Sequence, residues 1–447
     1  MERIYDSESG DILIALTGEA LIARKLNVFK EEQFLALREK LVNADVTFGN
    51  AECLFEDYSD APNTYAGGGS GRGTYMASPP ESVEQLQWMG IDIVSTANNH
   101  CSDFGEGGIL TNLEFLDKYG MAHAGTGANL TEARAPGYLD TPKGRVALVA
   151  AADWGPRGTG GSPWPFPMGV MAGEQAPYSL GRPGCNLVRH KPRFTVPKDV
   201  FDSLKHMAGE LKFENQAGAG DTEFLFMGSE VVLGEDFYLS TVAELDDLED
   251  NFRWVREARR QADWVMFSFH NHGASRSAET PSDHTRILAH GVIDNGADLF
   301  IGHGPHRDRG IEIYNGKPIF YALGDFILQN DSLLWAPHDV MKRFGLGYEH
   351  TPADFYDERI RWGWNSNVEG WESVAVTCRY EAKQLKEIRL YPVDLGMGRP
   401  RGQAGRPVLA QPGGEVNRRV LERFQGMSAV YGTHIEIENG VGVISVS

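Results

Sequence analysis

One segment indicates the fold class, GADLFIGHGPHRDRGIEIYNGKPIFYALGDF (Gly296–Phe326). Its apolar run Leu299–Ile301 predicts a short buried strand, and a polar stretch, GHGPH, follows directly. Asn315-Gly316 is a strong turn dipeptide, so we predict a hairpin with strands at Ile311–Tyr314 and Pro318–Ala322. Polar residues at the carboxyl end of a buried strand are typical of a binding site in an open α/β sheet.

On both sides of this segment, short apolar strands alternate with amphipathic helices. The predicted strands are Ile12–Thr17, Val46–Phe48, Ile91–Ser95, Val146–Ala151 and Trp264–Phe269. The predicted helices are Val28–Val42, Ser82–Met89, Gly108–Tyr119, Val242–Gln261 and Thr285–Asn295. This alternation indicates a layered α/β fold.

We expect one enlarged domain rather than several in a row. Residues 1–330 are predicted to form this domain, with a Gly- and Pro-rich insertion at about residues 155–235. Residues 331–447 are predicted to be an irregular, Trp-rich extension that packs on this domain. The stretch GGGSGRG (Gly67–Gly73) lacks the Lys-Ser/Thr ending of a P-loop, so we expect a loop without a phosphate-binding role.

Charge and hydropathy exclude several classes of partner. The chain has 447 residues, with 42 Lys and Arg against 62 Asp and Glu, and a net charge of −20. This balance argues against binding to a nucleic-acid backbone. We find no secretory signal and no apolar run of the roughly 18 residues that a membrane helix needs. The four scattered cysteines favour a reduced compartment, so we predict a cytoplasmic protein without a membrane partner. The oligomeric state is left open.

Polar residues gather after five of the predicted strands. These clusters are Gly18-Glu19, Asn50–Glu52, Asn98–Asp103, Ser268–Gly273 and Gly302–His306. Each cluster alone has an ordinary explanation as a turn, a helix cap or a structural hydrogen bond. Five clusters at strand ends instead indicate a shared site. Imidazoles and carboxylates together favour a transition-metal or zinc-like ion, and two such ions would make a bimetal hydrolase centre.

The order Gly-acid, Asn-x-Glu, Asn-Asn-His, Ser-x-His and Gly-His-x-x-His resembles a known family. It is similar to the CapA-type poly-gamma-glutamate and capsule biosynthesis family of the calcineurin-like metallophosphatase superfamily. The resemblance covers about Ile12–Leu328 and is most specific in ANNHCSDFG (Ala97–Gly105), AGTGANLTEARAP (Ala124–Pro136) and Gly296–Phe326. GRPGCN (Gly181–Asn186) also resembles a stretch in soluble members. The resemblance implies a four-layer α/β/β/α sandwich of calcineurin-like metallophosphatase fold, with the site at one edge.

The resemblance also implies roles for particular residues. The implied metal ligands are Glu19 and His306 at one position, Asn99, His270 and His303 at the second, and Glu52 as the bridge. The implied catalytic residues are His100 as general acid, Asp103 as the carboxylate that orients it, and Glu19 and His270 as further acid–base groups. The candidates for substrate binding are Asn98, His272 and Asp325.

Two residues depart from the family pattern. Glu19 stands where the family has Asp, and the added methylene shifts the carboxylate and weakens the first metal position. Asp325 stands where the family usually has Asn, which adds a negative charge near the site. We therefore expect a divalent metal (Mn, Zn, Fe, Mg or Ca), with the reservation that Glu19 could make it dispensable.

Three functions follow as alternatives, and we favour the first. The chain could be a metal-assisted hydrolase of a phosphoester or a glutamyl/peptide-type substrate. It could instead be a metal-independent epimerase that inverts a Cα centre of a precursor peptide, because a small branch of the superfamily resembles lasso-peptide epimerases. It could also be a non-catalytic accessory protein of polymer synthesis. The expected partner is therefore a small molecule or a peptide.

Overall fold

The structure of the chain is a computed structural model that describes residues 10–57, 74–154, 170–212, 220–227, 229–273, 277–362 and 366–446. Two stretches singled out in the sequence, Gly67–Gly73 and Gly155–Pro167, lie outside the described residues. The prediction that Gly67–Gly73 is a loop without a phosphate-binding role therefore stays a prediction.

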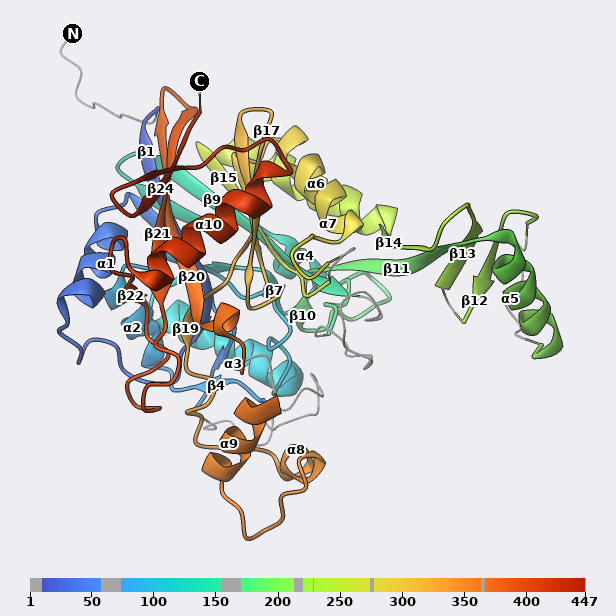
Figure 1. The fold of residues 1–447 in the computed structure, drawn as a ribbon, viewed down its shortest axis with the longest axis horizontal. Helices are drawn as coiled ribbons and strands as arrows, with labels where there is room; N and C mark the ends of the chain where they lie inside the picture. Colours follow the sequence, from blue (N-terminus) through green and yellow to red (C-terminus); the bar gives the residue numbers. More distant parts are fainter. Residues whose placement is uncertain are drawn as a thin grey trace.

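Two large mixed sheets form the centre of the molecule (Figure 1). The first sheet runs in the order β23 (Glu436–Glu438), β24 (Val441–Ser445), β21 (Gln384–Asp394), β20 (Glu372–Glu381), β1 (Ile12–Leu21), β2 (Val46–Asn50), β5 (Ile93–Ser95) and β6 (Ala122–Ala124), with β19 (Asp325–Leu328) beside β1 and β22 (Val408–Leu409) beside β21. The second runs in the order β12 (Glu223–Phe226), β13 (Ser229–Leu233), β11 (Leu187–Val196), β9 (Gly144–Trp154), β15 (Trp264–His270), β16 (Leu299–His303), β18 (Lys317–Leu323) and β17 (Asp308–Tyr314), with β14 (Tyr238–Ala243) beside β11 and β8 (Gly137–Thr141) beside β9.

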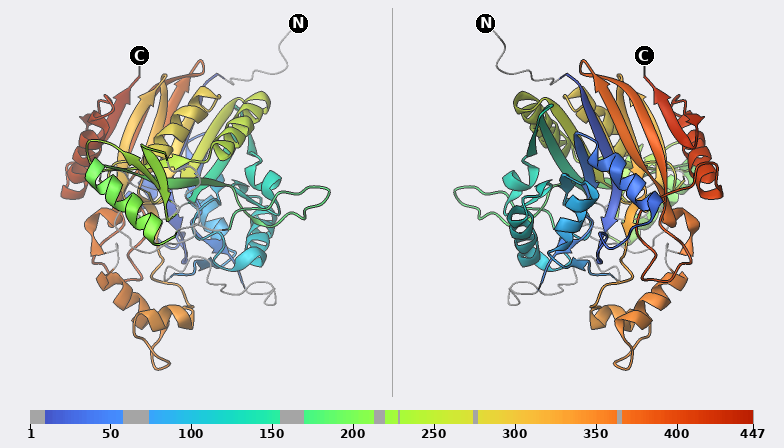
Figure 2. Two further views of the ribbon diagram at one scale, coloured as in Figure 1. Left: turned by 90° about the vertical axis from the view of Figure 1, so that its right-hand side faces the viewer. Right: turned by 90° about the vertical axis from the view of Figure 1, so that its left-hand side faces the viewer.

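The core lies in three layers that follow the alternation of side chains along the strands. Ile14 and Phe48 of the first sheet share one apolar cluster with Leu148 and Ile301 of the second, so the two sheets pack face to face. The helices α1 (Glu32–Val42), α2 (Ser82–Met89) and α3 (Gly105–Lys118) share a cluster with the first sheet, and α6 (Leu245–Gln261) and α7 (Asp283–Asp294) share one with the second. Figure 2 shows these helices outside the sheets. The predicted α/β/β/α sandwich is thus confirmed.

Most predicted elements of the first 330 residues are present, with shifted limits. The helix predicted from Val242 begins at Leu245, because the residues before it pair with β11 as strand β14. The hairpin is confirmed as β17 and β18, and Asn315 and Gly316 have φ of 51° and 72°, the left-handed values that a tight turn requires. Among the described residues, no helix is long and apolar enough to cross a membrane.

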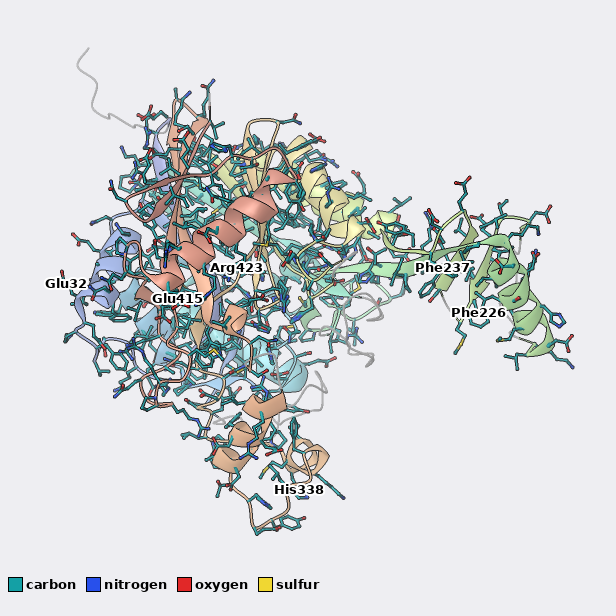
Figure 3. The ribbon with its side chains drawn as sticks, in the orientation of Figure 1. Glu32, Phe226, Phe237, His338, Glu415 and Arg423 are labelled. Atoms are coloured by element: carbon teal, nitrogen blue, oxygen red, sulfur yellow. The ribbon has the colours of Figure 1, made fainter. Side chains whose placement is uncertain are left out.

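The prediction of an irregular C-terminal extension is wrong. Strand β20 pairs antiparallel with β1 and with β21, so the first sheet is complete only with residues beyond 371. Helix α10 (Glu415–Ala429), on which Figure 3 labels Glu415 and Arg423, packs against β17 and β21. Arg423 pairs with Asp308 and Glu372. The buried run ESVAVTC at the start of β20 has the alternating pattern that is typical of a strand. A Gly- and Trp-rich stretch precedes it, which makes the strand difficult to recognise in the sequence. The domain limits themselves stay predictions.

The segment predicted as an insertion is only partly separate from the sandwich. Strand β11 lies within it and pairs in parallel with β9 of the second sheet. Beyond the sandwich, α5 (Lys198–Glu210) covers β12 and β13 around a small core of its own that includes Phe201 and Phe224. Figure 1 shows this lobe extending away from the body of the molecule.

Candidate functional site

The residues predicted for the site meet at the carboxyl edge of the parallel strands β1, β2, β15 and β16. Asn50 closes β2, His270 closes β15 and His303 closes β16. Strand register places His270 beside His303 in the second sheet, and Glu19 beside Asn50 in the first. Because parallel strands end at a common edge, residues far apart in the sequence come together here.

Glu19 lies inside β1 rather than after it, which corrects the sequence prediction. The register of β1 shifts on both sides of Glu19, against β2 and against β19. A Cβ on the preceding Gly18 would lie 1.8 Å from the carbonyl oxygen of Gly324, so only glycine allows this close approach. An irregularity of this kind re-aims a side chain, and here it accompanies the Glu19 carboxylate that lies in the site.

Glu19, His306 and Asp325 form a compact group. Nδ1 of His306 lies 2.5 Å from Oε2 of Glu19 and 2.9 Å from Oδ1 of Asp325. The other carboxylate oxygen of Glu19 accepts a hydrogen bond from the backbone N–H of Gly304. His306 itself has φ of 52°, a conformation that non-glycine residues hold only where the surrounding structure enforces it.

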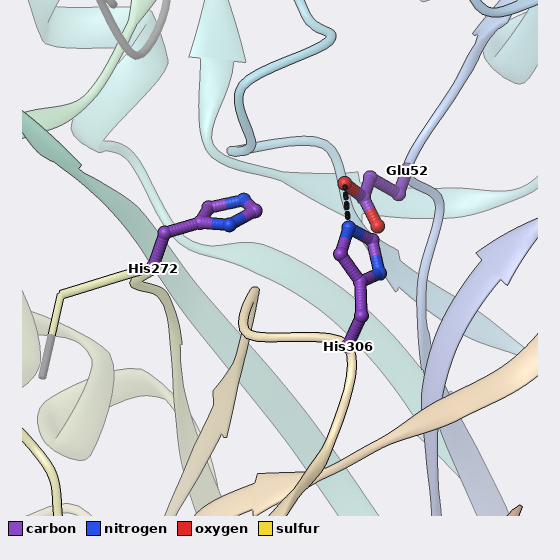
Figure 4. Close-up of side chains that lie close together, drawn as sticks. All are labelled: Glu52, His272 and His306. Atoms are coloured by element: carbon purple, nitrogen blue, oxygen red, sulfur yellow. Dashed lines mark ion pairs between the residues drawn. The ribbon is translucent and has the colours of Figure 1, made fainter. Parts of the chain in front are cut away.

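Glu52 lies at the centre of the site, with three imidazoles around one of its oxygens. Oε1 of Glu52 lies 3.7 Å from Nε2 of His306, 3.8 Å from Nε2 of His100 and 3.9 Å from Nε2 of His270. These distances exceed those of hydrogen bonds but match the separations of ligands around a shared cation. Figure 4 shows Glu52 beside His306, with His272 across from both.

A row of histidines continues from this point along the second sheet. Nδ1 of His270 lies 2.9 Å from Nδ1 of His303, and Nε2 of His270 lies 3.0 Å from Nε2 of His272. Nε2 of His272 is in turn 3.3 Å from Oδ1 of Asn99. Nε2 of His303 is 2.6 Å from the hydroxyl of Ser268. The structure thus brings all six predicted metal ligands into one neighbourhood, while their roles as ligands stay predictions.

His100 and Asp103 form the pair that the sequence predicts. Nδ1 of His100 lies 2.6 Å from Oδ2 of Asp103, which also accepts the backbone N–H of Met76 at 2.9 Å. A carboxylate held in this way fixes the orientation of the ring. Asn98 is fully buried, and its amide already donates to the carbonyl of Ala51 and accepts the N–H of His100. These bonds give Asn98 a supporting place in the loop, and its substrate contact stays a prediction.

Burial acts on the carboxyl groups of the site in one direction, by raising their pKa values. For Glu19, the positive charge of His306 and hydrogen bonds outweigh burial and hold the pKa well below its ordinary value. Burial and the negative charge of Glu19 raise the pKa of Glu52 well above its ordinary value. Burial also raises the pKa of Asp325 to about 8, although His306 opposes the change. A bound cation would lower all three values.

Three histidines of the site differ in the direction in which their pKa values are shifted. Burial would lower the pKa of His306, but the charges of Glu19, Glu52 and Asp325 raise it well above its ordinary value. Burial lowers the pKa of His303 to about 4. Burial and the neighbouring His303 also lower the pKa of His270. Neutral imidazoles are the form that binds a metal, so His270 and His303 need no deprotonation before they bind one.

The donor set fits a divalent metal. Among the described residues of this site, two groups of ligand atoms lie close enough together to hold an ion, Glu52 with His272 and His306, and Glu19 with Glu52, His306 and Asp325. Oxygen and imidazole donors suit zinc, manganese or iron. His306 and Glu52 belong to both groups, so two ions in this space would share ligands.

Metal affinity is expected to rise with pH between about 6 and 9, by roughly tenfold per pH unit for each proton released. In the metal-free protein, Asp325 keeps its proton up to about pH 8, and Glu52 and His306 also have raised pKa values. Binding must displace these protons, and the displacement becomes easier as the pH rises. Titration calorimetry in buffers of different ionisation enthalpy measures the proton release. Asp325→Asn should reduce this slope, and an affinity that is constant over this range would contradict the assignment.

A second buried cluster lies directly behind the site and was missed in the sequence. Nδ1 of His190 lies 2.6 Å from Oδ1 of Asp153, and Nε2 of His284 lies 3.6 Å from the same oxygen. The side-chain amide of Asn271 donates to Oδ2 of Asp153 at 3.0 Å and lies 3.1 Å from Nε2 of His284. The backbone N–H of Asn271 donates to the carbonyl of His303 at 2.7 Å. Asn271 therefore connects this cluster with His303 of the candidate site by hydrogen bonds.

The geometry of this second cluster favours a positioning role over metal binding. The rings of His190 and His284 stack with centroids 4.1 Å apart and planes inclined by 14°. An ion binds imidazole nitrogen near the plane of the ring, and one ion cannot lie in two planes stacked in this way. Asn271 stands between His270 and His272, so Asp153 holds both histidines in place through it. An Asn between two histidines at a strand end was the available signal in the sequence.

Comparison with known proteins identifies the family of the chain. The sequence model of the bacterial capsule synthesis protein PGA_cap matches residues 8–330. The chain belongs to this family. The matched region contains every residue of the candidate site and ends shortly after Asp325. The resemblance to CapA-type proteins seen in the sequence is thereby confirmed.

Relatives of this PGA_cap chain include proteins named for capsule or polymer synthesis. An uncharacterized protein of Sinorhizobium fredii, y4sH, is 33% identical over 442 residues, which cover 96% of this chain and 91% of that protein. The capsule biosynthesis protein CapA of Bacillus anthracis is 20% identical over 73% of this chain and 60% of its own length. A Mycobacterium tuberculosis protein named as a probable polyglutamine synthesis accessory protein is 26% identical over 56% of this chain and 48% of its own.

Proposed function

We propose that the chain is a metal-dependent hydrolase of a phosphoester or a glutamyl/peptide-type substrate. The observation that supports this proposal best is the position of Glu52, whose Oε1 lies between three imidazole nitrogens at 3.7–3.9 Å. Neutral His270 and His303 complete a donor set that suits a divalent ion. When bound, such an ion supplies Lewis acidity and lowers the pKa of water.

The residues of the chain itself would carry the proton transfers and hold the substrate. His100 can donate a proton through Nε2 to a leaving group, while Asp103 holds Nδ1 and stabilises the charged ring. His272 and Asn99 lie on the same side of the histidine row and can orient a substrate by hydrogen bonds. Asp153 acts through Asn271 to keep the two histidines of that segment in place.

The proposed hydrolase is tested by metal analysis followed by an assay of hydrolysis. The purified full chain should hold at least one divalent ion per molecule. It should cleave bis(p-nitrophenyl) phosphate or γ-glutamyl-p-nitroanilide, and a chelator should abolish this activity until metal is restored. Activity that survives complete removal of metal would contradict the proposal, as would a metal-loaded chain that cleaves neither class of substrate.

One observation supports a second candidate, a peptide epimerase that works without metal. Glu19 contacts both His306 and the N–H of Gly304, so the first metal position is already satisfied by the protein itself. Such an acid–base pair could remove a proton from a peptide Cα, and His100 could return one from another side. Incorporation of solvent deuterium at a peptide Cα in the presence of chelator would favour this candidate.

A third candidate is a non-catalytic accessory role in polymer synthesis, which the names of two relatives support. Binding of the chain to a polymer synthetase, together with no hydrolysis and no exchange at Cα, would favour this role.

Glu19→Asp is expected to raise the metal content, from about one ion towards two ions per chain. The shorter side chain would withdraw from His306 and leave room for an ion at the position where Glu19 now contacts the imidazole. Elemental analysis of the dialysed protein measures the change. Glu19→Gln, which keeps the length and removes the charge, is the matched control and should not gain metal. An unchanged metal content in Glu19→Asp would show that the methylene is not what limits this position.

A further inference from the structure

Helix α10 lies beyond the part of the chain that the family model matches, yet its Arg423 contacts the strands next to the candidate site. The match ends at residue 330. Nε of Arg423 donates to Oδ2 of Asp308 at 3.0 Å, and its Nη1 lies 3.3 Å from Oε2 of Glu372. Both carboxylates are buried, each residue with 2% of its surface exposed. One guanidinium therefore joins the first residue of β17 to the first residue of β20.

Asp308 lies two residues after His306, a member of the candidate site. It pairs in register with Leu323 of β18, next to Gly324. A Cβ on Gly324 would lie 2.9 Å from Oδ1 of Asp308, so this oxygen packs directly against the glycine, while Oδ2 accepts from Arg423. The ion pair thus fixes the chain just beyond His306, whose φ of 52° persists only where the surrounding structure enforces it.

Glu372 precedes Ser373, whose hydroxyl donates to the backbone carbonyl of Asp325 at 2.5 Å. A Cβ on Gly324 would also lie 2.9 Å from Cβ of Ser373. The carbonyl of Gly324 in turn accepts the backbone N–H of Glu19 at 3.0 Å. The backbone of Glu19 and that of Asp325 are therefore held by neighbours of the two joined carboxylates.

The group that these contacts support leaves little room for displacement. Nδ1 of His306 lies 2.5 Å from Oε2 of Glu19 and 2.9 Å from Oδ1 of Asp325. Functional side chains need support that holds them to within about 0.5 Å. A guanidinium suits this task, because its planar fork has a fixed geometry and its removal would leave buried carboxylates without compensation. The side chain of Arg423 is itself only 15% exposed.

We propose that Arg423 is a positioning residue of the candidate site, which holds His306 and Asp325 against Glu19. It acts through the carboxylates of Asp308 and Glu372 rather than on a ligand. The segment after residue 330 would thus set the geometry of the site as well as complete the first sheet. That this geometry serves a metal ion rests on the proposed function, whereas the positioning of the His306 ring does not.

NMR spectra of the imidazole groups test the proposal in the metal-free full chain, labelled with 15N-histidine and recorded at a single pH. The signals of His306 are those that disappear in His306→Gln. Arg423→Ala should shift or split these signals, because the chain beside the ring is no longer held. Arg419→Ala is the matched control, since Arg419 lies one turn earlier on α10 and also pairs with Glu372. This variant keeps the link through Asp308 and should leave the His306 signals unchanged.

The affinity for zinc, measured by competition with a chromogenic chelator, is the second readout. Arg423→Ala should lower it by about 10- to 100-fold, the usual effect of losing a group that orients metal ligands. Arg423→Lys should recover part of the affinity, because an ammonium keeps the charge but lacks the fork that joins two carboxylates. Arg419→Ala should bind zinc as the wild type does.

The outcomes separate this proposal from the proposed function. A wild-type chain that binds no zinc would contradict the proposed function, but changed His306 signals in Arg423→Ala alone would still support the positioning role. Unchanged His306 signals in Arg423→Ala would overturn it, as would unchanged zinc affinity in a chain that binds zinc. An equal change in Arg419→Ala would also overturn it, by showing a general loosening of α10. If Arg423→Ala does not fold, Asp308→Asn takes its place with the same expected results.

Discussion

Glu52→Gln is expected to lower metal affinity by more than about 100-fold, because loss of a partner in the second shell of a metal site alone costs about 10- to 100-fold. Among the residues that the structure describes, Glu52 is the carboxylate that approaches His100, His270 and His306 together. The amide has the same shape but offers no negative charge to a cation. Metal affinity is measured by competition with a chromogenic chelator, and the metal content of the purified protein by elemental analysis.

The same substitution should leave the metal-free protein at least as stable as the wild type. Burial and the charge of Glu19 raise the pKa of Glu52, so the buried carboxyl group lowers the free energy of unfolding of the metal-free protein. A neutral amide removes this destabilisation. Added metal should therefore raise the melting temperature of the wild type, since an ion at 100 times its Kd adds about 2.7 kcal/mol, but not that of Glu52→Gln. A Glu52→Gln protein that keeps its metal-induced shift would show that Glu52 is not a ligand.

The location of the candidate site could be predicted from the sequence, because it depends on the order of strands and helices along the chain and on the spacing of apolar residues. His270 and His303 close buried strands that are neighbours in one sheet, and parallel strands end at one edge. Asn50 and Glu52 follow the same rule in the facing sheet. The alternation of strands and helices is enough to predict that these residues lie together.

Other parts of the site depend on contacts that a local pattern does not contain. The bulge at Glu19 accompanies the close approach of Gly18 to Gly324, more than 300 residues later. Asp153, His190 and His284 come from β9, β11 and α7, and none follows a strand in a way that marks it as a ligand. Their meeting requires the second sheet and its covering helix to be packed. A short-range pattern therefore predicts which edge is functional, but not what supports it.

The C-terminal segment shows the same limit on a larger scale. Strand β20 joins β1 across more than 350 residues, and its pairing could not be inferred before the order of strands in the first sheet was known. Once β20 is placed beside β1, the connection from β19 must lie at the functional edge.

His100→Ala is expected to lower kcat by about 10²- to 10⁴-fold, the usual contribution of general acid–base catalysis, while the metal content stays the same. Nδ1 of His100 is held by Asp103 at 2.6 Å, and its Nε2 is directed towards Glu52 at 3.8 Å, so the ring is placed to transfer a proton next to the metal ligands. Steady-state kinetics and elemental analysis of the same preparation measure both quantities. Added imidazole should restore part of the rate, because the missing side chain leaves room for it.

Asp103→Asn distinguishes a catalytic His100 from one that merely supports the fold. The amide keeps the size of the carboxylate and an oxygen for the N–H of Met76, but it removes the charge that stabilises a protonated His100. We therefore expect kcat to fall, by less than in His100→Ala. If His100→Ala instead loses its metal together with its activity, His100 is a ligand rather than the general acid. In that case the proton must come from elsewhere in the histidine row, where His272 lies 3.0 Å from His270 and is partly exposed.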